Sequence, residues 1–461
     1  MCYWRTLQPG REFAIRAARH DLTGVIAASA GALALAGLAA ALLQPLLLWA
    51  LLAGVALLGL LALTFAFPVP ASVGWLVLAG STPEMWLGDL AGGGWALIVG
   101  VVKLIGLALA GVCVLRYGAA ADLFNPGLAF LVMFAASIAH GRHENLDLAE
   151  SLRSLIGSFA PFAFSFSRLS LPWAGAIIRV TRWLPLILVA AGAALNAAGL
   201  RPLFVEDGGW RLGATGHPAF LAGFALAALE ACLLELLRDG RRGDLALLGA
   251  NALILVLTGA RAPLFLGAGV GAIAILAIPS AAFGATRRVT LVLAGACLLP
   301  VLIAAAGSLG EVRLFNVLSS EAGDLSGRDL IWPYFQDAWE ESPWVGWGVG
   351  AGKVLVPEET TLARLLGTTA AHNEYLRIGV DGGWLGLLLL IGLFVAWTIR
   401  HTRAMPRPDR WLMRLVMLAF AIHSYTDNTL IATTSSVLFA WVSAVFARGS
   451  LEAGLPSRDP R

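Results

Sequence analysis

The sequence predicts an all-α polytopic membrane protein. Of its 461 residues, 58% are hydrophobic and only 13% are charged, and the mean hydropathy is +0.79. A soluble domain carries roughly 25% charged residues, so this chain has too few charges to cover a surface in water. Apolar runs of about 20 residues, the length that crosses a bilayer as a helix, recur along most of the chain. These observations exclude a soluble enzyme, a secreted disulfide scaffold and a disordered protein.

The apolar runs predict about 12 to 14 transmembrane helices. Four arginines precede the first run and no cleavage pattern of small residues follows it, so we expect a retained helix rather than a signal peptide. Three runs are weaker because they are short or contain several polar residues; they are 71–89, 125–140 and 152–170. The other candidates are 22–43, 46–67, 94–115, 183–200, 217–237, 244–260, 262–281, 289–306, 376–399, 412–428 and 430–447.

Clusters of arginine in the short connections predict the orientation of the helices, because Lys and Arg in such loops favour the cytoplasm. Counting helices between the clusters puts all of the clusters, and both termini, on one side. Residues 451–461 are therefore expected to form a cytoplasmic tail. The clustered residues are Arg5, Arg11, Arg16, Arg19, Arg179, Arg182, Arg238, Arg241, Arg242, Arg287, Arg288, Arg400, Arg403, Arg407, Arg410 and Arg414.

Three segments then face the outer side of the membrane, namely 201–216, the turn 258–262 and the long stretch 307–375. The long stretch contains ten acidic and four basic residues, as expected outside the cytoplasm. A polar loop of this length in so apolar a chain is usually functional. We therefore expect one large helical loop that folds over a substrate.

Residues 326–353 of this loop have the sequence SGRDLIWPYFQDAWEESPWVGWGVGAGK. Ser326 with Asp329 three residues later resembles a capping box that opens a helix. One face of that helix is apolar, which is typical of a functional surface or of an interfacial helix anchored by tryptophans. The residues of this face are Ile331, Trp332, Phe335, Ala338 and Trp339. The glycines that alternate from 346 to 352 allow a close backbone approach to a phosphate or a sugar, whereas a nucleotide site would need a βαβ context.

Polar groups also gather where the loop re-enters the membrane. His372, Asn373 and Glu374 lie there, and Arg211 and Arg261 lie in the other two outer segments. No second His stands three or four residues from His372, so no zinc motif is predicted. Two guanidinium groups and nearby helix N-termini suit a pyrophosphate, because each Arg offers paired donors and a permanent charge. The alternatives are snorkelling arginines at the membrane surface and a histidine that merely caps a helix.

Four stretches together give the chain a resemblance to the superfamily of O-antigen ligases and O-antigen polymerases, which transfer glycans of the bacterial envelope. They are RLGATGHP in the first outer segment, TGAR in the turn, GRDLIW with PWVGWGVG in the long loop, and HNEYL with GGWLGLL at the re-entry. Their order and separations resemble that family over residues 201–450. Residues 1–200 resemble it only as a string of apolar helices. The turn has Ala260 where the commoner form of the family has Ser.

The resemblance implies a lipid-sugar transferase with a GT-C-like architecture in the bacterial inner membrane, active on the periplasmic face. Its donor would be a glycan on undecaprenyl pyrophosphate, and its acceptor would be lipid A core or another lipid-linked glycan. No metal, other cofactor or nucleic acid is implied. The essential residues of the family carry over onto Arg211, Arg261 and His372. The arginines would stabilise the leaving pyrophosphate, and His372 would accept or orient the proton of the acceptor, with Glu374 as the competing base.

Seven further residues are expected to bind substrate; they are Arg328, Trp332, Trp347, Gly348, Asn373, Tyr375 and His217. The tryptophans would stack on sugars or on the polyprenyl tail. His423, Tyr425 and Asp427 form another polar cluster within an apolar run. Such clusters often mark a site, but this one ranks below the residues of the outer segments.

A transporter or flippase for lipid-linked glycans is the non-enzymatic alternative. Transporters place charges near the bilayer midplane and often contain inverted repeats. Here the notable charges lie at the outer surface and no repeat is evident, although Lys103 and the cluster around Asp427 hint at a midplane site. A peptidoglycan polymerase of the shape-and-division type is a second enzymatic alternative, which the HNEYL motif fits less well. Ligase and polymerase stay open, because both use the same donor chemistry.

Overall fold

The computed structural model describes residues 62–85, 95–120, 122–206, 209–293, 328–357, 360–366 and 368–454, together with a few positions between 28 and 59. The chain divides into two compact units, Met1–Pro68 and Val69–Arg461. Most of each of the helices expected at 22–43, 46–67 and 289–306 lies outside the described residues, as do residues 307–327 of the long loop and the tail from 455.

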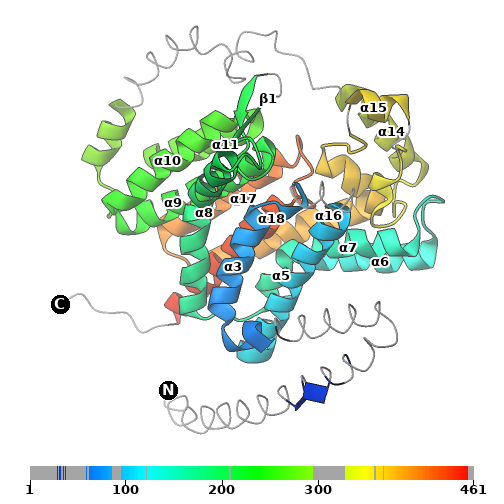
Figure 1. Ribbon diagram of the computed structural model, residues 1–461, viewed down its shortest axis with the longest axis horizontal. Helices are drawn as coiled ribbons and strands as arrows, with labels where there is room; N and C mark the ends of the chain where they lie inside the picture. The colour runs from blue at the N-terminus through cyan, green and yellow to red at the C-terminus, as the bar shows by residue number, and fades with distance from the viewer. Residues whose placement is uncertain are drawn as a thin grey trace. The chain divides into compact units, whose positions relative to one another are not determined.

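The second unit is mostly helical, as predicted (Figure 1). Its helices are α3 (Pro68–Gly80), α5 (Trp95–Tyr117), α6 (Gly127–His140), α7 (Leu148–Phe159), α8 (Leu171–Ala197), α9 (Pro218–Asp239), α10 (Arg242–Thr258), α11 (Arg261–Leu276), α14 (Arg328–Glu341), α15 (Thr361–Leu366), α16 (Glu374–Thr402), α17 (Arg407–His423) and α18 (Thr433–Ala453), with the 3₁₀ turns η1 (Ala160–Phe166) and η2 (Ala351–Lys353). Among the described residues the only strands are β1 (Phe204–Glu206) and β2 (Trp210–Leu212), an antiparallel hairpin in the first outer segment.

Four of the described helices are long and apolar enough to cross a membrane, namely α5 from Ile98 onward, α8, α9 and α16. The shorter apolar helices are α3, α6 and α11. The described part of the chain therefore supports a membrane protein of helical type. The expected total of 12 to 14 spans includes segments that the structure does not describe.

Two expectations from the sequence are wrong around residues 148–197. The run 152–170 is not one helix, because α7 ends at Phe159 and a 3₁₀ turn with Pro161 follows it. Arg179 and Arg182 do not flank a loop but lie inside α8. Arg182 pairs there with Asp244 in the first turn of α10, and this partner allows a charged residue to remain within an otherwise apolar helix.

Local sequence signals set the ends of the helices that carry the outer segments. His217 caps α9, since its Nδ1 accepts a hydrogen bond from the backbone N–H of Ala219 at 3.2 Å, and Pro218 occupies the first helical position. Gly259 ends α10 in the left-handed conformation with φ of 62°. This glycine lets the chain reverse and start α11 two residues later at Arg261.

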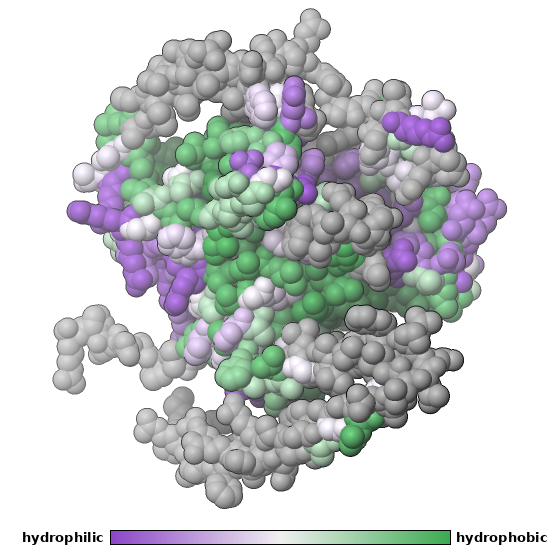
Figure 2. Space-filling view, viewed as in Figure 1, coloured by the Kyte–Doolittle hydropathy of each residue, from purple (hydrophilic) through white to green (hydrophobic). Residues whose placement is uncertain are grey.

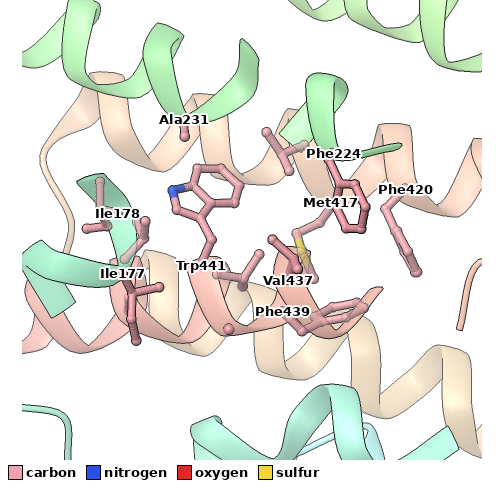
Figure 3. Packing of buried hydrophobic residues seen from close by; sticks show 14 of the residues in the cluster. Ile177, Ile178, Phe224, Ala231, Met417, Phe420, Val437, Phe439 and Trp441 are labelled. Carbon is pink, nitrogen blue, oxygen red and sulfur yellow. The ribbon is translucent and has the colours of Figure 1, made fainter. Parts of the chain in front are cut away.

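Helix α18 lies at the centre of the packed helices and contacts α5, α8, α9, α16 and η1. Figure 3 shows its Val437, Phe439 and Trp441 among apolar side chains of α8, α9 and α17. Trp441 and Phe439 are completely buried. Serine, alanine and glycine fill half of the remaining positions of α18, and small residues let membrane helices approach closely without a hydrophobic driving force.

A basic end is formed where α9 and α18 end and α17 begins, and it includes Arg238 from the predicted clusters. Arg238, at the end of α9, lies 3.4 Å from Asp409 on α17 and 2.5 Å from Glu452 on α18. Nearby, Arg448 lies 2.6 Å from Glu235. In Figure 2 hydrophobic residues cover much of the middle of the visible face, while hydrophilic residues gather towards its margins. The side of the membrane that this basic end faces stays a prediction.

Candidate functional site

His372 lies at the opposite end, immediately before α16, in a strained backbone conformation. Its φ is +47°, in the left-handed region that non-glycine residues seldom adopt. Asn373 follows as the N-cap of α16, and its Oδ1 accepts hydrogen bonds from the backbone N–H groups of Tyr375 and Leu376 at 3.0 and 3.3 Å. The cap fixes the start of α16 directly after His372, so the strained backbone at His372 sets the position of its imidazole. Strain of this kind persists where the surroundings enforce it and often accompanies function.

The imidazole of His372 lies between two polar side chains. Its Nδ1 is 3.3 Å from Oδ1 of Asp427, and its Nε2 is 3.3 Å from the hydroxyl of Thr368. The second oxygen of Asp427 is 3.9 Å from Nε2 of His423. A carboxylate on one ring nitrogen holds the imidazole in one tautomer and orientation, which leaves the other nitrogen to exchange a proton.

Asp427 remains ionised more readily than an ordinary aspartic acid. Burial alone would raise its pKa, but the hydrogen bond with His372 and the charges of His423 and His372 lower the pKa below the ordinary 3.8. The backbone N–H of Asn428 donates a further hydrogen bond to Oδ1 at 2.8 Å. The pair of His372 and Asp427 therefore offers a negative charge that can stabilise an imidazolium.

Glu374, the competing base in the sequence-based prediction, is 2% exposed. Its Oε2 accepts a hydrogen bond from Nε of Arg377 at 2.5 Å, and its Oε1 accepts one from the backbone N–H of Leu430 at 2.6 Å. The backbone N–H of Glu374 itself donates to the carbonyl of Ser424 at 2.8 Å. Glu374 thus ties the start of α16 to both sides of the segment that carries Asp427.

Arg377 continues this buried network towards the long loop. Its Nη1 lies 2.9 Å from Oδ2 of Asp381, and Oδ1 of Asp381 accepts a hydrogen bond from the backbone N–H of Gly352 at 3.1 Å. Lys353 next to it lies 3.3 Å from Glu150 on α7. Burial lowers the pKa of Lys353, although Glu150 opposes that effect. The network fastens the glycine-rich part of the loop to α16 and α7.

The glycine-rich segment packs against protein instead of standing open to a ligand. The backbone N–H groups of Trp347 and Gly348 donate to the carbonyls of Val380 and Asp381 at 2.8 and 3.0 Å. Gly348 has φ of +97°, and a Cβ there would lie 2.9 Å from Ser137 on α6. The indole of Trp347 donates to the carbonyl of Ala338 at 2.6 Å. Trp347 and Gly348 therefore join α14, α16 and α6.

Helix α14 turns its apolar face onto α16. Ile331, Phe335 and Ala338 are buried, and the ring of Trp339 lies 4.7 Å from that of Trp384. The apolar face of the helix expected from Ser326 onward is thus covered by protein. The described part of the helix begins at Arg328, whose side chain lies outside the described residues.

Two aromatic residues from the predicted substrate-binding set lie beside the histidine. Trp332 donates from its indole to the carbonyl of Ala371 at 2.8 Å, and its ring lies 5.9 Å from that of Tyr425. The hydroxyl of Tyr375 donates to the carbonyl of Ala421 at 2.7 Å. These contacts hold the segments on either side of His372 in place.

The segments that carry the two predicted arginines are in contact. Arg211, on β2, is 6% exposed, and its Nε donates to the carbonyl of Thr258 at 2.8 Å. Arg261 is exposed and begins α11, three residues after Thr258. Arg211 therefore braces the turn that presents Arg261.

A cavity of about 570 Å³ opens between α9, α17 and α18. It brings together His217 and His372 from the predicted site, and it adds Glu84, Glu230, His423 and Asp427. The other predicted residues, namely Arg211, Arg261, Glu374, Trp332, Trp347, Gly348, Asn373 and Tyr375, do not line it. Among the described residues no group of three or more His, Cys, Asp or Glu side chains is arranged to hold a metal ion.

Sequence reasoning missed two carboxylates of this cavity. Glu84 follows α3, and burial raises its pKa while Thr433 and Lys103 oppose the rise. Glu230 sits in the middle of α9. A charge inside an apolar helix is a sequence signal that could have marked Glu230, whereas nothing in the local sequence connects Glu84 with residues more than 100 positions away.

The family model described as O-antigen ligase matches residues 245–391. The matched region contains Arg261, the described parts of the long loop and His372, whereas Arg211 and Asp427 lie outside it. The match confirms the resemblance to the superfamily of O-antigen ligases and polymerases and supports glycan transfer of that general type by a membrane protein. A comparison with curated proteins found no match.

Proposed function

We propose that the protein transfers a glycan from undecaprenyl pyrophosphate to a second glycan at the periplasmic face of the bacterial inner membrane. Residues 201–450 form the catalytic region, both termini are cytoplasmic, and the helices have a GT-C-like arrangement. The observation that carries the proposal is the pairing of His372 with Asp427 at a cavity, within a chain whose residues 245–391 match the O-antigen ligase model.

In the reaction, a hydroxyl of the acceptor attacks the anomeric carbon of the donor sugar. The bond between that carbon and the phosphate oxygen breaks, and the electron pair leaves with undecaprenyl pyrophosphate. His372 takes the proton of the attacking hydroxyl, and the carboxylate of Asp427, 3.3 Å away, stabilises the imidazolium. Water at the outer surface then accepts the proton from His372.

The leaving pyrophosphate gains negative charge as the bond breaks, so it needs fixed positive charge nearby. Arg261 supplies an exposed guanidinium at the start of α11, and Arg211 braces the turn behind it. The N-terminus of α11 adds backbone N–H groups that favour an anion. The positive charge of these arginines can stabilise the leaving group without a metal ion.

The test uses the purified protein in lipid with a synthetic undecaprenyl-pyrophosphate oligosaccharide, with and without EDTA. The readouts are released undecaprenyl pyrophosphate and the size of the product, for the wild type and His372→Ala. We expect turnover by the wild type in EDTA and none by the variant at equal protein levels. A ladder of lipid-linked glycans without added acceptor identifies a polymerase, and turnover only with lipid A core identifies a ligase. Donor binding without any turnover would overturn the proposal in favour of a flippase.

A further inference from the structure

The cavity follows one face of α9 for several turns. Its lining residues on this helix include Phe220, Gly223, Ala227 and Glu230, which recur at three- and four-residue spacing. From His217 at the start of α9 to Glu230 is 13 residues, which corresponds to about 20 Å along a helix. The cavity is therefore an elongated slot that runs from the level of His372 down between α9, α17 and α18.

Glu230 lines this slot without a protein partner. Its residue is 3% exposed, and within the described part of the chain its carboxyl group makes no hydrogen bond or ion pair. A carboxyl group buried without a partner costs free energy whether it is ionised or neutral. Ionisable groups within membrane helices usually face the bundle interior or a cavity and often mark a substrate or ion pathway.

Two more hydrogen-bond acceptors around the slot lack partners. They are Oε2 of Glu84 and Oδ1 of Asn428, both buried. Asp427 adds another carboxylate near the rim, and no Arg or Lys lines the slot within the described residues. The unpaired acceptors, and the lack of Arg and Lys among the described lining residues, favour a ligand that brings hydrogen-bond donors over an anionic one.

The lining of the slot distinguishes between the lipid pyrophosphate of the donor and the sugars of the acceptor. A pyrophosphate offers only acceptors and negative charge, which the ionised carboxylate of Asp427 would repel. A polyprenyl chain has no donor for the carboxyl group of Glu230. The hydroxyls of a sugar are donors, and the apolar faces of its rings suit side chains such as Phe220 and Phe420, which also line the slot.

We infer that the slot binds the sugars of the acceptor glycan. One acceptor hydroxyl lies at His372, and others donate to Glu84, Asn428 and Glu230. The donor pyrophosphate stays outside the slot, on the side of Arg261. This inference rests on the proposed glycan transfer and adds to it the place of the acceptor and the carboxyl group that recognises it.

Binding is tested without catalysis by labelling a cysteine in the slot. Ala227→Cys places a thiol beside Glu230, and the described native cysteines, Cys113 and Cys232, are buried, so the wild type gives the labelling background. The probes are the two candidate acceptor glycans without lipid, namely the oligosaccharide released by mild acid from the host's lipid-linked glycan and the core oligosaccharide released from its lipid A. We expect one of these oligosaccharides to slow labelling by a small methanethiosulfonate, and undecaprenyl pyrophosphate without sugars not to do so. Protection by undecaprenyl pyrophosphate, or by none of the three compounds, would overturn the inference.

Kinetics then identify the carboxyl group. Glu230→Leu should raise the KM for the acceptor about tenfold or more, as expected for a lost hydrogen bond to a buried carboxyl group, and leave the KM for the donor unchanged. Glu230→Gln keeps a carbonyl acceptor and should recover most of the affinity, which excludes misfolding as the cause. The matched control is Glu235→Gln, on the same helix but paired with Arg448 and outside the slot. A rise in the KM for the donor instead would contradict the inference.

The two proposals fail in distinguishable ways. In one outcome the wild type performs no transfer, but an oligosaccharide still protects Ala227→Cys from labelling. That result would contradict the proposed reaction and still support a sugar site in the slot. In the other outcome transfer is normal, but no oligosaccharide protects Ala227→Cys and replacing Glu230 leaves the KM for the acceptor unchanged. That result would contradict the slot as the acceptor site and still support the proposed reaction.

Discussion

Nδ1 of His372 lies 3.3 Å from Oδ1 of Asp427, although 55 residues of chain separate them. Helices α16 and α17 fill that separation, running away from the site and back to it. The pairing therefore depends on the antiparallel packing of these two helices and on the clamp that Glu374 makes to Ser424 and Leu430.

The first prediction concerns this pairing. Asp427→Asn keeps the shape of the side chain but removes the charge that stabilises the imidazolium, so we expect the transfer rate to fall by about 10²-fold or more. Asp337→Asn, at an exposed position of α14, is the control and should leave the rate unchanged. Because His372→Ala should be inactive, the coupling between the two residues is measured by thermal unfolding, where Asp427→Asn should lower the midpoint less in the His372→Ala background than in the wild type. Equal losses of midpoint from Asp427→Asn in both backgrounds would contradict the pairing.

The second prediction uses the backbone strain at His372, whose φ is +47°. Glycine adopts this conformation without a Cβ clash, so His372→Gly should be more stable than His372→Ala by about 1 kcal/mol. Both variants should be inactive. Thermal unfolding in detergent measures the difference. Equal midpoints for the two variants would show that the strained backbone does not lower the stability of the protein.

The third prediction separates a positioning role of Glu374 from a role as base. Glu374→Gln keeps an oxygen that accepts the hydrogen bond from the backbone N–H of Leu430. Glu374→Ala removes the acceptor both of that N–H and of the guanidinium of Arg377. We expect Glu374→Gln to retain transfer within about tenfold and an unchanged pH profile. Glu374→Ala should destabilise the protein by about 2–4 kcal/mol. A stable but inactive Glu374→Gln would identify the carboxylate as the base.

Much of the fold could be predicted because its signals are local. Apolar runs located the helices, and the runs predicted at 217–237 and 244–260 agree with α9 and α10 to within two residues at each end. The break at Phe159 was missed, because the 3₁₀ turn that follows is as apolar as the helix before it.

The site was harder to predict, because it depends on contacts between distant segments. The spacing of Glu374, Arg377 and Asp381 already fits one helix face and could have indicated that these charges neutralise each other. The glycines around 348 are required by close approach to α6 and α16, a contact that no periodicity in the loop reveals. The cluster containing Asp427 was noticed in the sequence, but its contact with His372 could be found only in the folded chain.

The fourth prediction compares the two arginines. Arg261 is exposed, so Arg261→Ala should leave the unfolding midpoint unchanged and weaken the binding of undecaprenyl pyrophosphate about tenfold or more. Arg211 is buried and braces the carbonyl of Thr258, so Arg211→Ala should lower both the affinity and the midpoint. Isothermal calorimetry and thermal unfolding in the same detergent measure the two effects. Unchanged affinity in Arg261→Ala would remove this residue from the donor site.

The fifth prediction is a pH dependence of stability that belongs to Asp427. The hydrogen bond with His372 and the charges of His423 and His372 outweigh burial and lower its pKa below 3.8. A carboxyl group with a lowered pKa in the folded state stabilises the fold above the unfolded pKa and loses that contribution as the pH falls through the folded value. The unfolding midpoint of the wild type should therefore exceed that of Asp427→Asn near pH 6, and the difference should shrink as the pH falls from about 5 towards 3. Tryptophan fluorescence during heating measures both proteins at each pH, with the exposed control Asp337→Asn alongside. A difference that widens towards pH 3 would mean that Asp427 is protonated more easily in the folded protein than in the unfolded chain, and would contradict an ionised partner for His372.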